Sequence, residues 1–249
     1  MKKLFRALLM CVSMFTVIPL GNIVWDESAR GIMLLFLPVC GAVIGGGWAL
    51  LLYLVRLLGL PALVCGALLC VYPALVTGFI HLDGFLDLSD AILSRRDMAE
   101  RRRILKDPHV GSFAVLSCVM LFILQFAFLS SVPADAPALV LLFIPVVTRA
   151  LAALCVTVLR PISESEYAGL YREGIKTSHA VIPAIAAAAA VALCFLFFGL
   201  YGFAPLAAGV FYLLFVLRGV RALGGMSGDV SGHALCVGEL GAVAVFALL

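Results

Sequence analysis

Charged side chains are scarce in this sequence: aspartate, glutamate, lysine and arginine together make up 12% of its 249 residues. Hydrophobic residues make up 64%, and the mean hydropathy is +1.19. A water-soluble domain of this length requires much more polar surface than these residues provide. The composition therefore excludes a soluble protein, and we expect one integral-membrane domain over residues 1–249.

Motifs of several common cofactor sites are also absent. The sequence contains no Walker loop, no GxGxxG pattern after a strand and no CxxC pair, and its eight cysteines are scattered through apolar runs. These absences argue against a P-loop nucleotidase, a dinucleotide-binding domain, a Cys/His zinc centre and a disulfide framework. The net charge of +3 is modest, and we expect no nucleic-acid partner.

Long apolar stretches are the main feature that is present. A helix of about 20 residues crosses a bilayer, and seven stretches approach or exceed that length. We expect an all-α polytopic membrane protein, a bundle of about 6–8 transmembrane helices. The seven stretches are 31–55, 59–80, 110–132, 136–158, 180–200, 201–217 and 234–249.

Three polar segments, 81–109, 159–179 and 218–233, separate these stretches and carry most of the lysine and arginine. Cytoplasmic loops of membrane proteins are enriched in these residues, so all three segments are expected on the cytoplasmic side. Two apolar stretches separate each segment from the next, which agrees with a shared side.

The N-terminal segment 4–20 follows two lysines but lacks an A-x-A-like cleavage site of a secretory signal peptide. If this segment crossed the membrane fully, the basic segment 81–109 would lie outside. We therefore expect an amphipathic helix that is interfacial or re-entrant, in preference to a transmembrane span.

The most informative motif is acidic: Asp83, Asp87 and Asp90 follow His81 at spacings of i, i+4 and i+7 among themselves. Seven residues make nearly two helical turns, so a cytoplasmic-side acidic helix would carry all three carboxylates on one face. Such a cluster is costly without a neutralising partner. Carboxylate oxygens suit Mg²⁺, whereas zinc requires more nitrogen or sulfur ligands. His81 is either a substrate-binding residue or a helix-end hydrogen-bonding group.

A basic run follows the acidic motif. Carboxylates that hold a metal beside guanidinium groups are typical of phosphoryl transfer, which predicts a phosphorylated or nucleotide substrate. The alternative is that these charges serve only membrane orientation. Asp107 is a fourth candidate catalytic acid, as a metal ligand or an orienting residue. The candidate phosphate-binding side chains of this run are Arg95, Arg96, Arg102, Arg103 and Lys106.

A glycine-rich turn occupies residues 224–229 in the third polar segment. Its backbone N–H groups are able to face a phosphate, although plain glycine loops between spans are common. The candidate binding residues here are Gly225, Gly228 and Asp229, which would share the membrane side of the acidic motif.

These motifs together closely resemble the cobalamin synthase family (adenosylcobinamide-GDP ribazoletransferase). The resemblance rests on residues 77–90, 102–111 and 224–229, and it extends over most of the chain through 15–19, 38–41 and Arg149. Ala91 and Ala114 stand where the family usually has glycine, and Ser227 where it has threonine. These changes replace one small residue by another and leave the carboxylates in place.

The resemblance implies an enzyme that joins α-ribazole, or its 5′-phosphate, to adenosylcobinamide-GDP and releases GMP, forming adenosylcobalamin or its phosphate. It implies Mg²⁺ on Asp83, Asp87 and Asp90, a phosphate-binding Arg149, and a prokaryotic inner membrane with the active site on its cytoplasmic side. The lipid bilayer is the constant partner, and a homo-oligomer or a complex with other nucleotide-loop enzymes is a further expectation. The rival from another class is a cation transporter, whose site usually lies near the bilayer midplane on broken helices.

Overall fold

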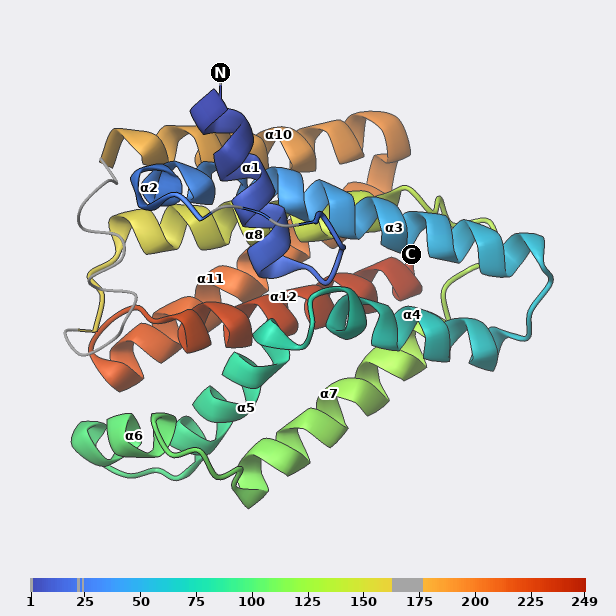
Figure 1. The fold of residues 1–249 in the computed structure, drawn as a ribbon. Helices are drawn as coiled ribbons and strands as arrows, with labels where there is room; N and C mark the ends of the chain where they lie inside the picture. The colour runs from blue at the N-terminus through green and yellow to red at the C-terminus, as the bar shows by residue number, and fades with distance from the viewer. Residues whose placement is uncertain (1, 22, 24, 163–176) are drawn as a thin grey trace.

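The computed structural model describes residues 2–21, 23, 25–162 and 177–249, and these are almost entirely helical (Figure 1). No β-strand occurs within these ranges, where one isolated bridge pairs Pro161 with Met226. The all-α expectation is therefore confirmed, while 163–176 of the second polar segment lies outside the described residues. The helices are α1 (Lys2–Phe15), α2 (Arg30–Met33), α3 (Leu37–Leu57), α4 (Ala62–Val76), α5 (Ile80–Leu93), α6 (Met98–Leu105), α7 (Ser112–Ser130), α8 (Val140–Val158), α10 (Val181–Phe198), α11 (Phe203–Leu223) and α12 (Gly228–Leu248), with 3-10 turns η1 (Glu27–Ala29), η2 (Leu34–Phe36), η3 (Thr177–Ala180) and η4 (Gly199–Gly202).

Five helical segments among the described residues are long and apolar enough to cross a membrane, or six if the bent pair α4 and α5 forms one span. One of the five, Ser178–Leu223, contains 46 residues and includes both α10 and α11. The chain turns between them at Gly199, where φ is +57°, so two of the expected stretches form separate helices (Figure 1). The polytopic membrane fold expected from hydropathy is confirmed.

The bundle places α3, α8 and α10 together on one side and α11 and α12 beneath them, with α5, α6 and α7 beyond α12 (Figure 1). Close helix contacts support this arrangement. A Cβ on Gly45 of α3 would lie 2.5 Å from the carbonyl oxygen of Leu142 in α8, so these two backbones touch directly.

The apolar stretch 59–80, expected as one span, breaks before its end. α4 ends at Val76, and α5 starts at Ile80 with its axis turned by 92°. Gly78 and Phe79 both have left-handed backbone conformations, with φ of +59° and +63°. The amide of Phe79 donates to the carbonyl of Ala74 at 2.9 Å, which closes the end of α4. The acidic motif therefore lies on a helix of its own.

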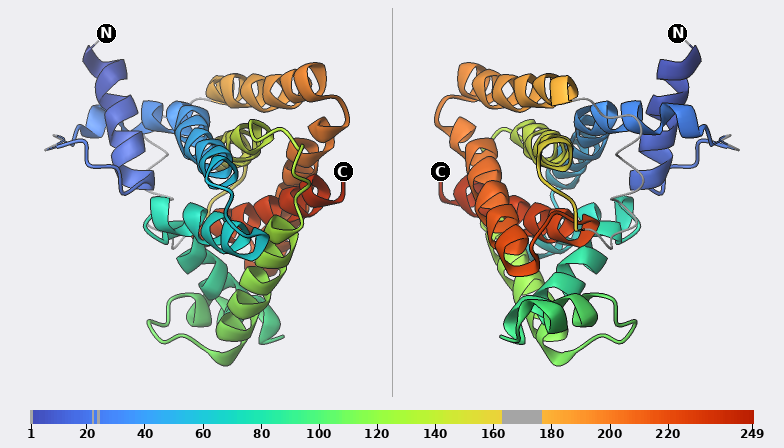
Figure 2. Two further views of the ribbon diagram at one scale, coloured as in Figure 1. Left: turned by 90° about the vertical axis from the view of Figure 1, so that its right-hand side faces the viewer. Right: turned by 90° about the vertical axis from the view of Figure 1, so that its left-hand side faces the viewer.

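The N-terminal helix α1 has 14 residues, a length of about 21 Å that is shorter than the apolar core of a bilayer, about 30 Å. Met10, Cys11 and Phe15 on one face are buried, while Lys3 and Arg6 are exposed. The expected amphipathic N-terminal helix is therefore confirmed. It stands at the outer edge of the molecule beside α3 and the start of α5 (Figure 2).

Candidate functional site

The acidic motif lies on α5, which is helical throughout the motif. Asp83, Asp87 and Asp90 therefore do share a face, with Asp83 exposed and the other two half-buried. Buried apolar residues on the opposite side, such as Phe85 and Leu88, hold the helix against its neighbours. The local sequence thus presents three carboxylates outward from a helix anchored by its apolar face.

A fourth carboxylate, that of Asp229, joins this face from the first turn of α12. α5 and α12 approach closely because both carry glycines at the crossing. A Cβ on Gly84 would lie 2.8 Å from the Cα of Asp229, and one on Gly232 would lie 2.9 Å from the carbonyl oxygen of His81. The negative charges that act on Asp87 are those of Asp83, Asp229 and Asp90. Two segments far apart in sequence thus form one acidic cluster.

Asp83 and Asp229 line a cavity of about 190 Å³, which we call the acidic cavity. Its remaining walls come from α1, α3 and α8, and they include His81 and Arg149. Gly228, one of the three residues expected from the glycine-rich turn, also lines it. The cavity brings together carboxylates, a guanidinium and an imidazole, which is a set able to bind a metal and a phosphate.

His81 lies at the inner wall of the acidic cavity. Its ring stacks on Phe15 of α1 with centroids 6.1 Å apart. Its Nε2 is buried and has no hydrogen-bond partner among the described residues. A buried polar atom without a partner is uncommon and is often completed by a ligand. Phe15, from the N-terminal segment, is a wall residue for which the sequence analysis had no role.

Arg149 of α8 is buried and pairs with Glu239 of α12. Its Nη1 also donates to the hydroxyl of Thr148 at 3.0 Å, whereas its Nε has no partner. A charged side chain inside a membrane bundle requires such pairing. Glu239 received no role from sequence reasoning, although it is the single acid in the long apolar part of α12. The pair fixes one side of the guanidinium and leaves the rest beside the cavity.

Asp90 binds the start of α7. One carboxylate oxygen accepts from the amide of Gly111 at 2.6 Å and the other from that of Ala114 at 2.9 Å. Amides at a helix N-terminus have no partner within the helix, and they favour negative charge. Both Asp90 oxygens thus stabilise the contact between α5 and α7.

The basic run is anchored away from the acidic cluster. The Nε of Arg102 donates to the carbonyl of Leu223 at 2.8 Å, at the end of α11. Arg103 pairs with Glu100 at 2.7 Å on the exposed surface of α6. Arg95 and Arg96 are exposed, as is Lys106. Within the described part of the chain, no ion pair joins the four arginines Arg95, Arg96, Arg102 and Arg103 to the acidic cluster.

Asp107 lies in the loop between α6 and α7, where it binds its own neighbour His109. Its Oδ1 accepts from the backbone amide of His109 at 3.0 Å and lies 2.7 Å from the Nδ1 of that ring. These hydrogen bonds hold the pKa of Asp107 below its usual value. Asp107 is therefore ionised near neutral pH and makes its hydrogen bonds within its own loop.

The glycine-rich turn is held by the segment after α8. The amide of Met226 donates to the carbonyl of Arg160 at 2.8 Å, and the amide of Ile162 donates back to Met226 at 3.0 Å. A Cβ on Gly225 would lie 2.7 Å from the nitrogen of Ile162, so only glycine fits there. The hydroxyl of Ser227 then accepts from the amide of Val230 at 3.2 Å and begins α12.

The donor set suits a hard divalent cation bound together with a substrate. Over the described ranges, no three His, Cys, Asp or Glu side chains form a closed metal cage. Mg²⁺ in proteins often takes only one or two carboxylates and completes its shell with water and phosphate oxygens. Asp83 and Asp229 at the acidic cavity, with Asp87 beside them, therefore fit Mg²⁺ carried with a phosphorylated ligand.

Comparisons with known proteins agree with these motifs. The sequence model of the family described as cobalamin-5-phosphate synthase matches residues 7–247. Proteins named adenosylcobinamide-GDP ribazoletransferase are similar to this chain in Clostridium botulinum (36% identity over 245 residues, 96% of both chains) and Clostridium perfringens (34% over 251 residues, 100% of both). One from Geobacillus thermodenitrificans is 30% identical over 246 residues, covering 96% of this chain and 94% of its own. No solved structure matches the chain. The family expected from the motifs, and with it the transferase class, is confirmed: the chain belongs to the cobalamin-5-phosphate synthase family.

Proposed function

We propose that this chain joins adenosylcobinamide-GDP to α-ribazole or its 5′-phosphate, releases GMP, and forms adenosylcobalamin or its phosphate. The names of its relatives support this substrate pair. The observation that carries the proposal is that Asp83 and Asp229, from separate helices, line one cavity with Arg149. Carboxylates for a metal and a guanidinium for a phosphate are the groups that transfer from a pyrophosphate requires.

The reaction balances as a substitution at phosphorus. A ribose hydroxyl of the acceptor attacks the phosphorus that carries the cobinamide arm, and the bond to the GMP phosphate breaks. The hydroxyl proton passes to a carboxylate, for which Asp83 is the most exposed candidate of the acidic cluster. GMP leaves with the electrons of the broken bond.

Mg²⁺ would neutralise charge on the pyrophosphate and on the leaving GMP. We assign its binding to Asp83 and Asp87, with Asp229 favoured as third ligand because both oxygens of Asp90 already accept amide hydrogen bonds. Arg149 is positioned by Glu239 to contact a phosphate through its unpartnered Nε. His81 supplies a second unpartnered nitrogen at the same cavity.

We infer that the site faces the cytoplasm across a prokaryotic inner membrane. The basic run of α6 and the arginines at the end of α11 lie at the same end of the bundle as α5 (Figure 1). Lysine and arginine concentrate on the cytoplasmic side of membrane proteins. A nucleotide-activated substrate made in the cytoplasm would then reach the site directly.

A cation transporter is the second candidate, since the 92° break before α5 is a feature that transporter ion sites share. Family membership favours the transferase, and one assay separates the two. Purified protein in detergent, given adenosylcobinamide-GDP, α-ribazole and Mg²⁺, should release GMP in proportion to the cobamide formed. No GMP release by monodisperse protein, or full release in excess chelator, would contradict the proposal or its metal requirement, respectively.

A further inference from the structure

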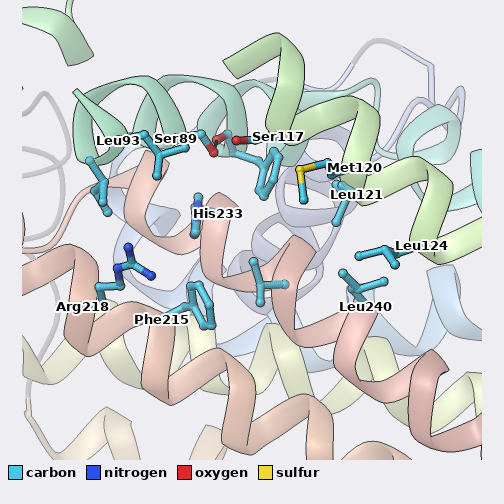
Figure 3. A pocket seen from close by; sticks show the side chains of 13 residues that line it. Ser89, Leu93, Ser117, Met120, Leu121, Leu124, Phe215, Arg218, His233 and Leu240 are labelled. Carbon is cyan, nitrogen blue, oxygen red and sulfur yellow. Dashed lines mark hydrogen bonds between the residues drawn. The ribbon is translucent and has the colours of Figure 1, made fainter. Parts of the chain in front are cut away.

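A second hollow lies on the opposite side of α5 from the acidic cluster. It has a volume of about 240 Å³ between α5, α7, α11 and α12 (Figure 3). We call it the lateral groove and define it by Phe85, Ser117, Leu124, Arg218, His233 and Leu240, which lie on these four helices. It shares no lining residue with the acidic cavity. The proposed transfer therefore leaves this groove without a role.

The groove opens sideways, through the outer face of α7. Met120 and Leu124 of its wall are 63% and 42% exposed, and both belong to a helix long and apolar enough to cross a membrane. In a bilayer, these side chains face hydrocarbon and not water. The molecules with direct access to such an opening are lipids.

One end of the groove is polar. His233 is buried there, and its ring lies between Phe85 and Phe215, with centroid distances of 4.9 and 5.6 Å. Its Nδ1 has no hydrogen-bond partner among the described residues. The guanidinium of Arg218 lies 5.9 Å from the centre of the Phe215 ring, and Figure 3 shows it pointing to the same end as His233. A cation and an unpartnered ring nitrogen thus meet at one place.

The polarity of the groove changes with depth along three helices. Ser117, Arg218 and His233 each lie about one and a half turns from the nearer end of their helix, all at the end that carries the acidic cluster. Leu124 and Leu240 lie about three turns in, at the apolar end of the groove in Figure 3. A lipid of the adjacent leaflet has the same order, with its charged headgroup outward and its acyl chain toward the midplane.

We propose that the lateral groove binds an anionic phospholipid from this leaflet. Its phosphate pairs with Arg218, a headgroup hydroxyl or ester oxygen bonds the Nδ1 of His233 according to the ring tautomer, and an acyl chain lies along α7 and α12 toward Leu124 and Leu240. The depth gradient, the lateral opening and the positive charge all match this occupant. The lipid would thereby fill the space between the splayed α7 and the rest of the bundle.

The test uses the full chain reconstituted in phosphatidylcholine vesicles that contain a little phosphatidylglycerol with a photoreactive group in its acyl chain. After illumination, peptide mass spectrometry should place the cross-links on α7 and α12 near Leu124 and Leu240, above those on Leu196 of α10, which is 75% exposed. Unlabelled phosphatidylglycerol should compete about fivefold better than phosphatidylcholine, the effect of one cationic side chain on an anionic lipid.

Two variants on one helix make the test specific. Arg218→Gln should remove the preference for phosphatidylglycerol, whereas Arg221→Gln, an exposed arginine outside the groove, should keep it. Val237→Trp should fill the groove and abolish its cross-links. If Val237→Trp does not give monodisperse protein on size exclusion, the arginine pair still decides.

Four results would overturn the proposal. They are uniform labelling of all exposed apolar faces, equal competition by the two lipids, equal effects of Arg218→Gln and Arg221→Gln, and displacement of the label by α-ribazole or inorganic phosphate. The last result would make the groove a substrate site. None of these readouts depends on transferase activity, so the outcome is separate from that of the GMP assay.

Discussion

Gly84 of α5 and Asp229 of α12 meet backbone to backbone: a Cβ on Gly84 would lie 2.8 Å from the Cα of Asp229. This contact places a carboxylate from the C-terminal part of the chain against the acidic face of α5. The geometry of the candidate site therefore depends on a residue that has no side chain.

Gly84→Ala should displace α12 from α5 and lower the rate of GMP release by about 10²-fold, since a shift near 1 Å can cost that much in a positioned site. Gly46→Ala is the matched control, because its Cβ would meet the Leu142 side chain at 3.8 Å, an ordinary contact. Both variants should be compared at equal amounts of folded, membrane-inserted protein. Equal rates would mean that this contact does not position the site.

Asp83→Asn and Asp87→Asn should each lower turnover by about 10²-fold or more, the effect of removing a main electrostatic contact with the transition state. The control is Asp135→Asn, an exposed acid in the loop between α7 and α8, which should be silent. Rates should be followed as GMP release over a Mg²⁺ titration. A near-normal rate in Asp87→Asn would remove that residue from the metal site.

Asp90→Ala should lower the free energy of unfolding by about 1–2 kcal/mol, since two amides at the start of α7 lose their acceptor. Asp83→Ala should leave thermal unfolding in detergent nearly unchanged, because Asp83 is exposed and accepts no amide hydrogen bond. The two melting curves separate a capping aspartate from a purely functional one. Similar melting temperatures would argue against the capping role.

Glu239→Ala should destabilise the protein by about 3–5 kcal/mol, because the guanidinium of Arg149 would stay buried without its partner. The double variant Arg149→Met with Glu239→Leu removes both charges and should recover most of that stability. It should still release little GMP if Arg149 contacts a phosphate. A stable double variant with a normal rate would show that the pair is only structural.

Arg102→Lys should impair GMP release more than Arg103→Lys. The Nε of Arg102 holds the end of α11 just before the turn that leads to Asp229, and lysine has no planar fork to replace it. Arg103 pairs only with exposed Glu100, and such pairs contribute little. The measurement is GMP release against the concentration of the nucleotide-activated substrate. If Arg103→Lys were the slower variant, the phosphate contacts would lie on that face of α6.

Hydropathy and residue spacing were sufficient for the membrane class, the helical character and the acidic face of α5. In a bilayer, backbone groups must bond within their own segment, so long apolar stretches have few alternatives to helix. The motif around Asp83 also identified the family, because its residue types and spacing occur within one continuous segment. The amphipathic N-terminal helix followed in the same way from its local pattern.

Tertiary structure decided which residues surround the cavity. Hydropathy is uniform across 59–80, yet two consecutive left-handed residues, Gly78 and Phe79, turn the chain there. Asp90 lies on the same helical face as Asp83, but the arrival of α7 engages both of its oxygens. Arg149 acquires Glu239 only because α8 and α12 pack together. Spacing within one helix is a local property, whereas pairing between helices depends on where small side chains let two backbones meet.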